Sequence, residues 1–396
     1  MRRVLEYRPL IPQSALDYVK DVFESGCLAG TCGRFVKLFE DALARFLGVK
    51  YVIACSSGTS ALHTCLRSIG VSYRDVVLVP GFTFVATASS VLHAGAIPLF
   101  VDVSSDDLNI DLTDLEYVLK RLKDKSCVRA IIVVHIGGVP AKLSEILNIC
   151  EEYRLELVED CAQALGAEYN GKKVGTFGKV SAFSFYPTKT ITTGEGGAVA
   201  TSDENVHNIA RMFINHGEDR RYHYVMLGYN YRMSEINAAI GLAQLENIEY
   251  YIESRRTFAE TFIREVSSRL GDLVSFQKPA PGCKPCWNLI EILINLEKLN
   301  VSRDRLVQEL KNEGLRIISV AYPEPLNMSP LFQNIENLLP YEINIERGLL
   351  YRRLKNCMYI CSRVITVLVP PGLSEDDAHN AAEIFINVIR KFCSNL

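Results

Sequence analysis

The stretch FSFYPTKTITTGEGGAVATS, from Phe183 to Ser202, carries the strongest indication of the fold. It begins within the short apolar run SAFSFY, which starts at Ser181, and ends in GAVATS; both runs are typical of strands buried on both faces. Between them stands one lysine, Lys189, followed by small residues and glycines that would let a bulky ligand approach the backbone. An isolated lysine is most often a solvated surface charge. Partial burial after an apolar strand would instead lower the pKa of the amine and favour its attack on a carbonyl carbon.

Five further apolar runs precede this stretch and complete the pattern of a sheet. They are YVIACSS, VVLVPGFTF, PLFVDV, VRAIIVVHI and LELVEDC. We expect a helix after each strand, because segments such as DLTDLEYVLKRLKDK and LSEILNICEEYR have apolar residues at helical spacing. The pattern predicts an α/β fold with a mainly parallel seven-stranded sheet and helices on both faces. Ligands of such sheets collect at the carboxyl ends of the strands.

The second part of the chain has a different pattern. From Ser234, the expected N-cap, to Leu270 the helical pattern is almost unbroken, and we interpret it as a linker helix. Beyond it, GCKPCWNLIEILIN and RVITVLV are typical of strands, while RDRLVQELKNEG and EDDAHNAAEIFINVIRKF are typical of helices. We therefore expect a large domain over residues 1–250 and a small C-terminal α/β domain over residues 251–396.

Charge and hydropathy exclude several classes of partner. The 43 basic and 46 acidic residues give a net charge of -3, so neither nucleic acid nor an anionic membrane is expected to bind. The uncharged stretch between Asp75 and Asp102 is divided by prolines and glycines into strand, helix and strand, which argues against a membrane span. The opening stretch MRRVLEYRPLIPQ has no continuous apolar segment, so we expect no secretion signal and a cytoplasmic location.

Twelve cysteines are spread through apolar patterns such as VIACSS and LNIC, where cysteine behaves as a small hydrophobic residue. This distribution fits a reducing cytoplasm. The pairs Cys283 and Cys286, and Cys357 and Cys361, could jointly bind zinc or form crosslinks. Their spacings match no zinc pattern well, so separate thiols are the favoured interpretation and no metal site is expected.

Three polar motifs follow strands of the predicted sheet. In CSSGTSALH, Gly58 allows close approach of the backbone, and Ser57, Thr59 and the first amides of the next helix can surround a phosphate. In LELVEDCAQALGA, Asp160 ends a buried strand and can hold a protonated ring nitrogen. Either motif alone also fits an ordinary helix cap. Together with Lys189, and in this order, they are what pyridoxal phosphate (PLP) requires of a protein.

Longer motifs point the same way. They are SGCLAGTCGRFVKLFE, SSGTSALH, PGFTFVATASSVLHAGAIPLFVDV, VEDCAQALGA, GTFGKVSAFSFYPTKTITTGEGG and GYNYRMSEINAAIGLAQLE, and they lie between Pro9 and Ile248. This series resembles the DegT/DnrJ/EryC1/StrS family of sugar aminotransferases, a branch of the fold-type I PLP enzymes. The resemblance implies that fold, PLP as the cofactor, and aminotransferase activity.

The resemblance also implies roles for single residues. Lys189 would form the Schiff base with the cofactor, and Asp160 would pair with its pyridine nitrogen. Gln163 would contact the ring hydroxyl. Phe84 would stack on the ring, although core packing would also explain this aromatic residue. The residues that match phosphate ligands are Gly58, Thr59 and Ser184.

Two further matches concern a second subunit and the substrate. Asn230, in GYNYRM, matches a residue that reaches the phosphate from the partner subunit, so the family implies a homodimer with shared active sites. Arg232 could clamp a substrate carboxylate or a nucleotide phosphate, but an arginine that opens a helix is about as often part of a surface ion pair.

The family implies transfer of an amino group from glutamate to a keto group of a nucleotide-linked sugar. Two alternatives come from relatives: dehydratases in which histidine replaces the Schiff-base lysine, and non-catalytic relatives that bind the cofactor for regulation. Lys189 argues against the first, and the set of Lys189, Asp160 and Gln163 against the second. The segments AYPEPLNMSPLF and VITVLVPPG depart from the family pattern. The identity of the acceptor therefore stays open, and a cyclic polyol ketone is one of the acceptors to consider.

Overall fold

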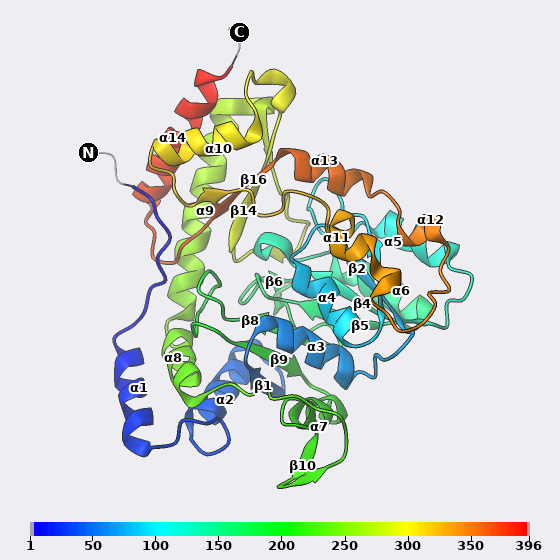
Figure 1. Ribbon diagram of the computed structural model, residues 1–396. Coiled ribbons are helices and arrows are strands. Elements are labelled where there is room, and N and C mark those ends of the chain that lie inside the picture. The colour runs from blue at the N-terminus through cyan, green and yellow to red at the C-terminus, as the bar shows by residue number, and fades with distance from the viewer. Residues whose placement is uncertain (1–3, 394–396) are drawn as a thin grey trace.

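The computed structural model describes residues 4–393 as an α/β structure built on one large sheet (Figure 1). Residues 1–3, which begin the stretch in which no secretion signal is expected, lie outside the described residues, as do residues 394–396. Across the sheet the strands are β1 (Tyr51–Cys55), β9 (Gly197–Thr201), β8 (Val180–Ser184), β5 (Glu156–Asp160), β4 (Val128–Val134), β2 (Val76–Pro80) and β3 (Ile97–Val101). Every pairing is parallel except those of β9, which runs antiparallel to β1 and β8. The predicted seven-stranded, mainly parallel sheet is therefore confirmed.

The reversed strand β9 follows from the connection that precedes it. Residues 185–196 join β8 to β9 without a helix, so the expectation that a helix follows every strand is wrong here. A return to a parallel neighbour needs a crossover of a dozen or more residues, usually helical, and this short glycine-containing loop makes an antiparallel return instead. The loop holds Lys189 at the carboxyl end of β8.

Helices cover both faces of the sheet, as predicted. Because side chains alternate along each strand, Val52 and Ala54 of β1 pack on one face while Ile53 and Cys55 pack on the other. The first face lies under α2 (Phe35–Leu47), α5 (Leu112–Arg121), α6 (Leu143–Tyr153) and α8 (Glu235–Leu245). The second lies under α3 (Gly58–Ser68), α4 (Val85–His93) and α7 (Glu204–Phe213).

The predicted linker helix consists of two helices, α8 and α9 (Ile248–Leu270). Ser234 caps α8, since its hydroxyl accepts from the amide of Asn237 at 3.2 Å, as expected. The helical pattern breaks at Glu246 and Asn247, where the amide side chain of Asn247 donates to the carbonyl of Ala243. In Figure 1, α9 runs along the molecule from α8 towards α14.

A second, antiparallel sheet lies in the C-terminal part. Its strands are β12 (Val274–Phe276), β14 (Leu289–Ile294), β16 (Val364–Leu368) and β15 (Ile318–Ser319). One face packs on α9, α10 (Arg303–Asn312) and α14 (Glu375–Lys391), around Phe258, Phe262 and Phe385. The strands and helices expected beyond Leu270 are thus present. The division of the chain at residue 250 stays a prediction.

The segment between β15 and β16 returns to the large sheet. It carries α11 (Pro330–Gln333), α12 (Arg347–Leu350) and α13 (Lys355–Arg363). Ile335, Leu339 and Leu349 join the core of the large sheet, and the Tyr341 hydroxyl donates to the carbonyl of Gly95 at 2.6 Å. The two sheets are therefore tied together by this segment as well as by α9.

The remaining elements are short, apart from α1 (Ser14–Ser25), which packs on α8 (Figure 1). They are β6 (Glu168–Tyr169), β7 (Lys172–Lys173), β10 (Glu218–Arg220), β11 (His223–Tyr224), β13 (Cys283–Lys284) and the 3₁₀ helices η1 (Ile136–Gly138), η2 (Gly271–Leu273), η3 (Leu296–Lys298), η4 (Leu326–Met328) and η5 (Ile335–Asn337). In residues 4–393 no helix is both long and apolar enough to cross a membrane.

Candidate active site

A cavity of about 550 Å³ lies at the carboxyl edge of the large sheet, where that sheet faces the small one. Seven of the nine expected site residues line it: Gly58, Thr59, Phe84, Asp160, Gln163, Ser184 and Lys189. The opposite wall comes from the small sheet and its loops, including Asn288, Tyr322 and Thr366. A larger, more open cavity of about 740 Å³ beside α5 and α13 contains none of the nine.

Lys189 is half-buried in the loop after β8. Desolvation lowers the pKa of its ammonium to about 8, an effect that the Asp160 carboxylate opposes and the Arg255 guanidinium reinforces. The backbone on either side of the amine is fixed, since the Lys189 amide donates to the carbonyl of Tyr186 and its carbonyl accepts from Arg255 at 2.8 Å. The lysine is therefore held at the cavity with about a tenth of its amine neutral at pH 7.

Asp160, at the end of β5, is buried, with 4% of its surface exposed. One carboxylate oxygen accepts from the Thr87 hydroxyl at 2.8 Å and the other from the amide of Ala162 at 3.1 Å. Burial raises the pKa of Asp160, although these hydrogen bonds and the nearby Lys189 act against the rise. In the part of the chain that the structure describes this carboxylate has no ion-pair partner, so a cationic ligand in the cavity would be stabilised.

Gln163 connects the two walls of the cavity. Its amide oxygen accepts from the backbone of Gly137 at 2.7 Å, which fixes the amide nitrogen as a donor towards the Tyr322 hydroxyl at 2.6 Å. Burial raises the pKa of Tyr322 well above its usual value, so this hydroxyl stays protonated. The second N–H of Gln163 has no partner among residues 4–393 and is free for a ligand.

The amino end of α3 forms a cradle on the large-sheet side. The Ser57 hydroxyl caps the helix by accepting from the amide of Ser60 at 3.1 Å, and a capping box completes the cap. A Cβ at Gly58 would come within 2.7 Å of the Ser184 Cβ, so only glycine fits at this position. The first amides of α3, with the hydroxyls of Thr59 and Ser184, therefore face the cavity as donors for an anion.

Phe84 stands at the N-cap position of α4 and is 61% exposed. Such exposure excludes core packing, the second interpretation of this residue, within the described part of the chain. The ring lines the cavity and offers a flat apolar surface to a ligand.

Comparison with known proteins decides the family. The profile of the DegT/DnrJ/EryC1/StrS aminotransferase family matches residues 9–385. The chain belongs to this family. It is 34% identical to GDP-perosamine synthase from Vibrio cholerae over 83% of this chain and 87% of that protein. It is 36% identical to the putative pyridoxal phosphate-dependent aminotransferase EpsN of Bacillus subtilis over 80% of each chain.

Solved structures agree. A DegT DnrJ EryC1 StrS aminotransferase from Brucella abortus superimposes with a TM-score of 0.83 at 30% identity, over 96% of each chain. The chain is therefore a PLP-dependent aminotransferase with the fold-type I architecture. The cavity of this aminotransferase fits PLP, because an anion cradle, a carboxylate with no ion-pair partner among residues 4–393 and an amine of lowered pKa all face the same space.

Two expected site residues lie outside the cavity of their own chain. Asn230 is exposed and bridges Asn215 through the backbone. Arg232 is half-buried, and its guanidinium donates to the side-chain oxygen of Asn215 at 2.8 Å. Both follow the β10–β11 hairpin, which projects from the molecule (Figure 1). Their predicted roles stay predictions.

Sequence reasoning missed several residues of the aminotransferase cavity. Thr87 lies in the TFVAT motif and was not predicted as a site residue. Its spacing of four residues from Thr83, at the start of a helix, could have indicated that the two side chains lie close together. Their hydroxyls are 2.9 Å apart. Asn288 and Tyr322 had no comparable signal, nor did Arg255, which is buried behind the cavity wall, because all three lie in the C-terminal part of the chain, far in sequence from Lys189.

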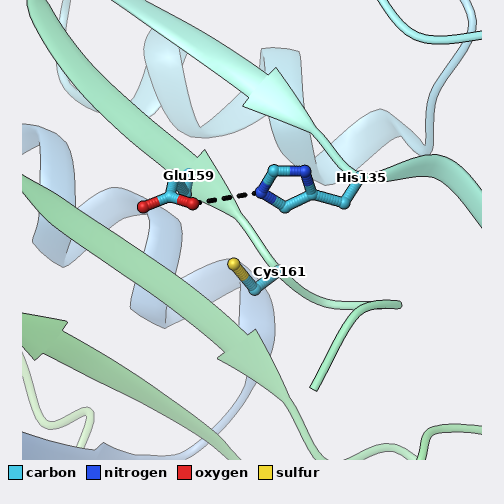
Figure 2. A group of neighbouring side chains, drawn as sticks. All are labelled: His135, Glu159 and Cys161. Atoms are coloured by element: carbon cyan, nitrogen blue, oxygen red, sulfur yellow. Dashed lines mark hydrogen bonds and ion pairs between the residues drawn. The ribbon is translucent and has the colours of Figure 1, made fainter. Parts of the chain in front are cut away.

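One cluster has the residue types of a metal site. His135, Glu159 and Cys161 are buried together, and the imidazole faces the carboxylate (Figure 2). His135 Nε2 lies 3.2 Å from a Glu159 carboxylate oxygen. Since His135 Nδ1 accepts from the Ala141 amide, Nε2 carries the proton and donates to Glu159.

The carboxylate of this cluster is also fully engaged by the backbone. Glu159 accepts from the amides of Gly175, Phe177 and Gly178 at 2.7 to 2.8 Å. Burial alone would raise the pKa of Glu159, but His135 and these amides hold it below its usual value. The cluster therefore braces the loop before β8 from the face opposite Asp160.

The cysteines expected to be separate thiols can also be located. Cys283, Cys286, Cys357 and Cys361 are all free in the structure, and burial raises the pKa of each thiol. In residues 4–393 they form no group with metal-ligand spacing. Cys286 instead packs against the carbonyl of Gln163, beside the cavity.

Proposed function

We propose that this aminotransferase moves an amino group from glutamate to a keto group of a nucleotide-linked sugar. The observation that carries the proposal is the cavity in which Lys189, Asp160 and the amino end of α3 converge. The acceptor class is supported by the 34% identity to a protein named GDP-perosamine synthase, which extends over most of both chains.

The large-sheet wall would hold the cofactor. Gly58, Thr59 and Ser184 would bind its phosphate at the positive end of α3. Asp160 would pair with the ring nitrogen, Gln163 with the ring hydroxyl, and Phe84 would cover the ring. When bound, PLP supplies an electron sink for the substrate carbon that loses or gains a proton.

Lys189 would have two tasks. Its lowered pKa makes the neutral amine available to bond covalently to the cofactor. Once the amino donor displaces it, the freed amine would move a proton at the reacting carbon as general base and then general acid. Asp160 would keep the ring nitrogen protonated, because a buried carboxylate stabilises a cation beside it.

We also propose a homodimer in which Asn230 completes the site of the other subunit. Large apolar side chains are exposed along the β10–β11 hairpin and its return: Tyr222, Tyr224, Val225 and Leu227. Tyr186 and Phe84 are exposed at the cavity. In the proposed dimer, the partner subunit would bury the apolar surface of the hairpin and that of the cavity rim. Mixing inactive Asn230→Ala and Lys189→Ala proteins should restore part of the activity, because some mixed dimers regain one intact site. Failure to recover activity despite measured subunit exchange would contradict shared sites.

A dehydratase and a regulatory relative remain the alternatives. The dehydratases of the family carry histidine where this chain has Lys189, and a regulator would need none of the proton-transfer groups. No observation on this chain favours either. A cytoplasmic location accords with substrates of this kind and stays part of the proposal.

The direct test is isotopic. The purified enzyme, loaded with PLP, is incubated with ¹⁵N-glutamate and a panel of GDP- and UDP-linked keto sugars, and products are identified by mass. We expect a ¹⁵N-amino sugar nucleotide with at least one acceptor and none with the Lys189→Ala protein. A deoxy product would favour the dehydratase. Tight PLP binding with no product from any acceptor would favour the regulator.

A further inference from the structure

A buried arginine that has no acidic partner in the described part of the chain lies directly behind Lys189. Arg255, on α9, is 0% exposed. Its guanidinium donates to two neutral oxygens: the carbonyl of Lys189 at 2.8 Å and the side-chain oxygen of Asn288 at 3.0 Å. Its Nε has no partner, and no described carboxylate forms an ion pair with it. The positive charge is therefore uncompensated.

Arg255 decides which way the amide of Asn288 points. A guanidinium has donors only, so the Asn288 side chain must turn its oxygen towards Arg255 and its NH₂ group away. Asn288 lines the cavity, and its NH₂ group has no acceptor among the described residues. The amide is thus a donor aimed at the space beside Lys189 and polarised by the cation behind it.

The backbone fixes this arrangement. Trp287 has the left-handed conformation, with φ of 49°, which is unusual for a bulky residue. This turn places its indole in the core of the small sheet while Asn288 faces the large sheet. Gly138 packs closely here, since a Cβ at that position would come within 3.0 Å of the backbone nitrogen of Asn288.

We propose that Asn288, oriented by Arg255, binds the carboxylate on the reacting carbon of the amino donor. The inference rests on the proposed function and specifies its donor subsite. An amino acid carries an anionic carboxylate on the carbon that reacts, whereas the reacting carbon of a keto sugar is flanked by neutral groups. A polarised donor in front of an uncompensated cation favours the anion. Arg232, the sequence-based candidate for an anion clamp, lies outside this cavity.

The test separates the two half-reactions. Asn288→Asp is nearly isosteric and gives Arg255 an anionic partner, so it should fold, yet it places a negative charge where the substrate carboxylate would lie. Conversion of the aldehyde form of the loaded enzyme by L-glutamate is followed by absorbance. We expect the glutamate concentration for half-maximal rate to rise about 100-fold in Asn288→Asp and about 10-fold in Asn288→Ala. Reaction of the amine form with the keto sugar should change less than about threefold, within the range of a rim contact.

A second readout does not depend on turnover. Succinate, which carries carboxylates but no amine, is titrated into the aldehyde form by calorimetry, and its affinity should fall at least about 10-fold in Asn288→Asp. The exposed Asn300→Ala serves as the matched control and should behave as wild type in both assays.

The outcomes can be told apart from failure of the proposed function. An unchanged glutamate response in both Asn288 variants, or an equal loss in the two half-reactions, would overturn the subsite. A loss confined to the keto-sugar reaction would assign Asn288 to the acceptor and also overturn it. If glutamate does not convert the wild-type enzyme, the proposed donor is wrong, and the succinate titration then decides the subsite alone.

Discussion

The two walls of the cavity differ in how their chemistry is encoded. The large-sheet wall carries the cradle at Gly58, the carboxylate of Asp160 and the amine of Lys189, each at or shortly beyond the carboxyl end of a strand. The small-sheet wall carries Asn288, Tyr322 and Thr366, which come from separate strands and loops. The first wall contains the groups that PLP chemistry requires, and the second contains groups that tertiary packing brings there from segments far apart in sequence. The comparison suggests that the large sheet provides the reaction and the small one the choice of substrate.

The strongest test of this division is Lys189→Ala. If the large wall provides the reaction, this variant should lose about 10⁴-fold or more in turnover, because both covalent attachment and proton transfer depend on the amine. Borohydride should no longer fix the cofactor to the protein, as peptide mapping would reveal. Lys179→Ala, a lysine paired with Asp203 away from the cavity, is the control. Activity near wild type in the Lys189 variant would remove the basis of the comparison.

Asp160→Asn should have the next largest effect. The neutral amide keeps the shape of the site but no longer stabilises a protonated ring nitrogen, so turnover should fall about 10²- to 10³-fold while the cofactor stays bound. Steady-state rates and the absorbance of the loaded protein would measure the two effects separately. Loss of the cofactor together with the rate would mean that Asp160 acts mainly in binding.

Glu291 probes the small wall through stability. It is fully buried on β14, one oxygen accepts from Thr366 at 2.6 Å and the other has no partner in the described structure. Burial raises the pKa of Glu291 to about 7. Between its unfolded pKa and pH 7 the folded state therefore holds the extra proton, so this group should make the protein less stable as the pH rises, by about 3 kcal/mol in total.

Replacing that glutamate should remove this loss. The gain in free energy of unfolding of Glu291→Gln over wild type should be larger at pH 8 than at pH 5 by about this amount, as measured by urea unfolding. The exposed Glu260→Gln is the matched control. An identical pH dependence in wild type and Glu291→Gln would mean that the buried carboxyl of Glu291 does not destabilise the fold as the pH rises.

Thr87→Val should have the smallest effect and would refine the comparison. The Thr87 hydroxyl donates to Asp160, and Thr83 in turn donates to Thr87, so the pair orients the carboxylate. Loss of one hydrogen bond to a charged group should reduce turnover about 10-fold and leave the glutamate concentration for half-maximal rate unchanged. Thr113→Val, at an exposed helix position, is the control. A raised glutamate requirement instead would place Thr87 in donor binding.

Much of the fold was readable because its signals are local. A strand buried on both faces has a continuous apolar run, as in VRAIIVVHI, and the seven runs became the seven strands. The reversal of β9 was missed, since it depends on the absence of a helix between residues 185 and 196 rather than on the strand itself. The break at Asn247 was also missed, because its side-chain bond to Ala243 does not disturb the apolar period.

The sequence by itself determined the reactive groups. Gly58, Asp160 and Lys189 each lie at or shortly beyond the carboxyl end of a strand. Parallel strands bring these ends to one edge, so spacing along the chain was enough to unite the three residues. Only the tertiary structure decided what surrounds the amine. Arg255 and Asn288 are far from Lys189 in sequence, and their burial and orientation arise where α9 and the small sheet pack on the large one. The lack of an acidic partner for Arg255 among the described residues arises there as well. Such properties depend on how segments far apart in sequence exclude water from the site, and a local pattern of residues does not predict that exclusion.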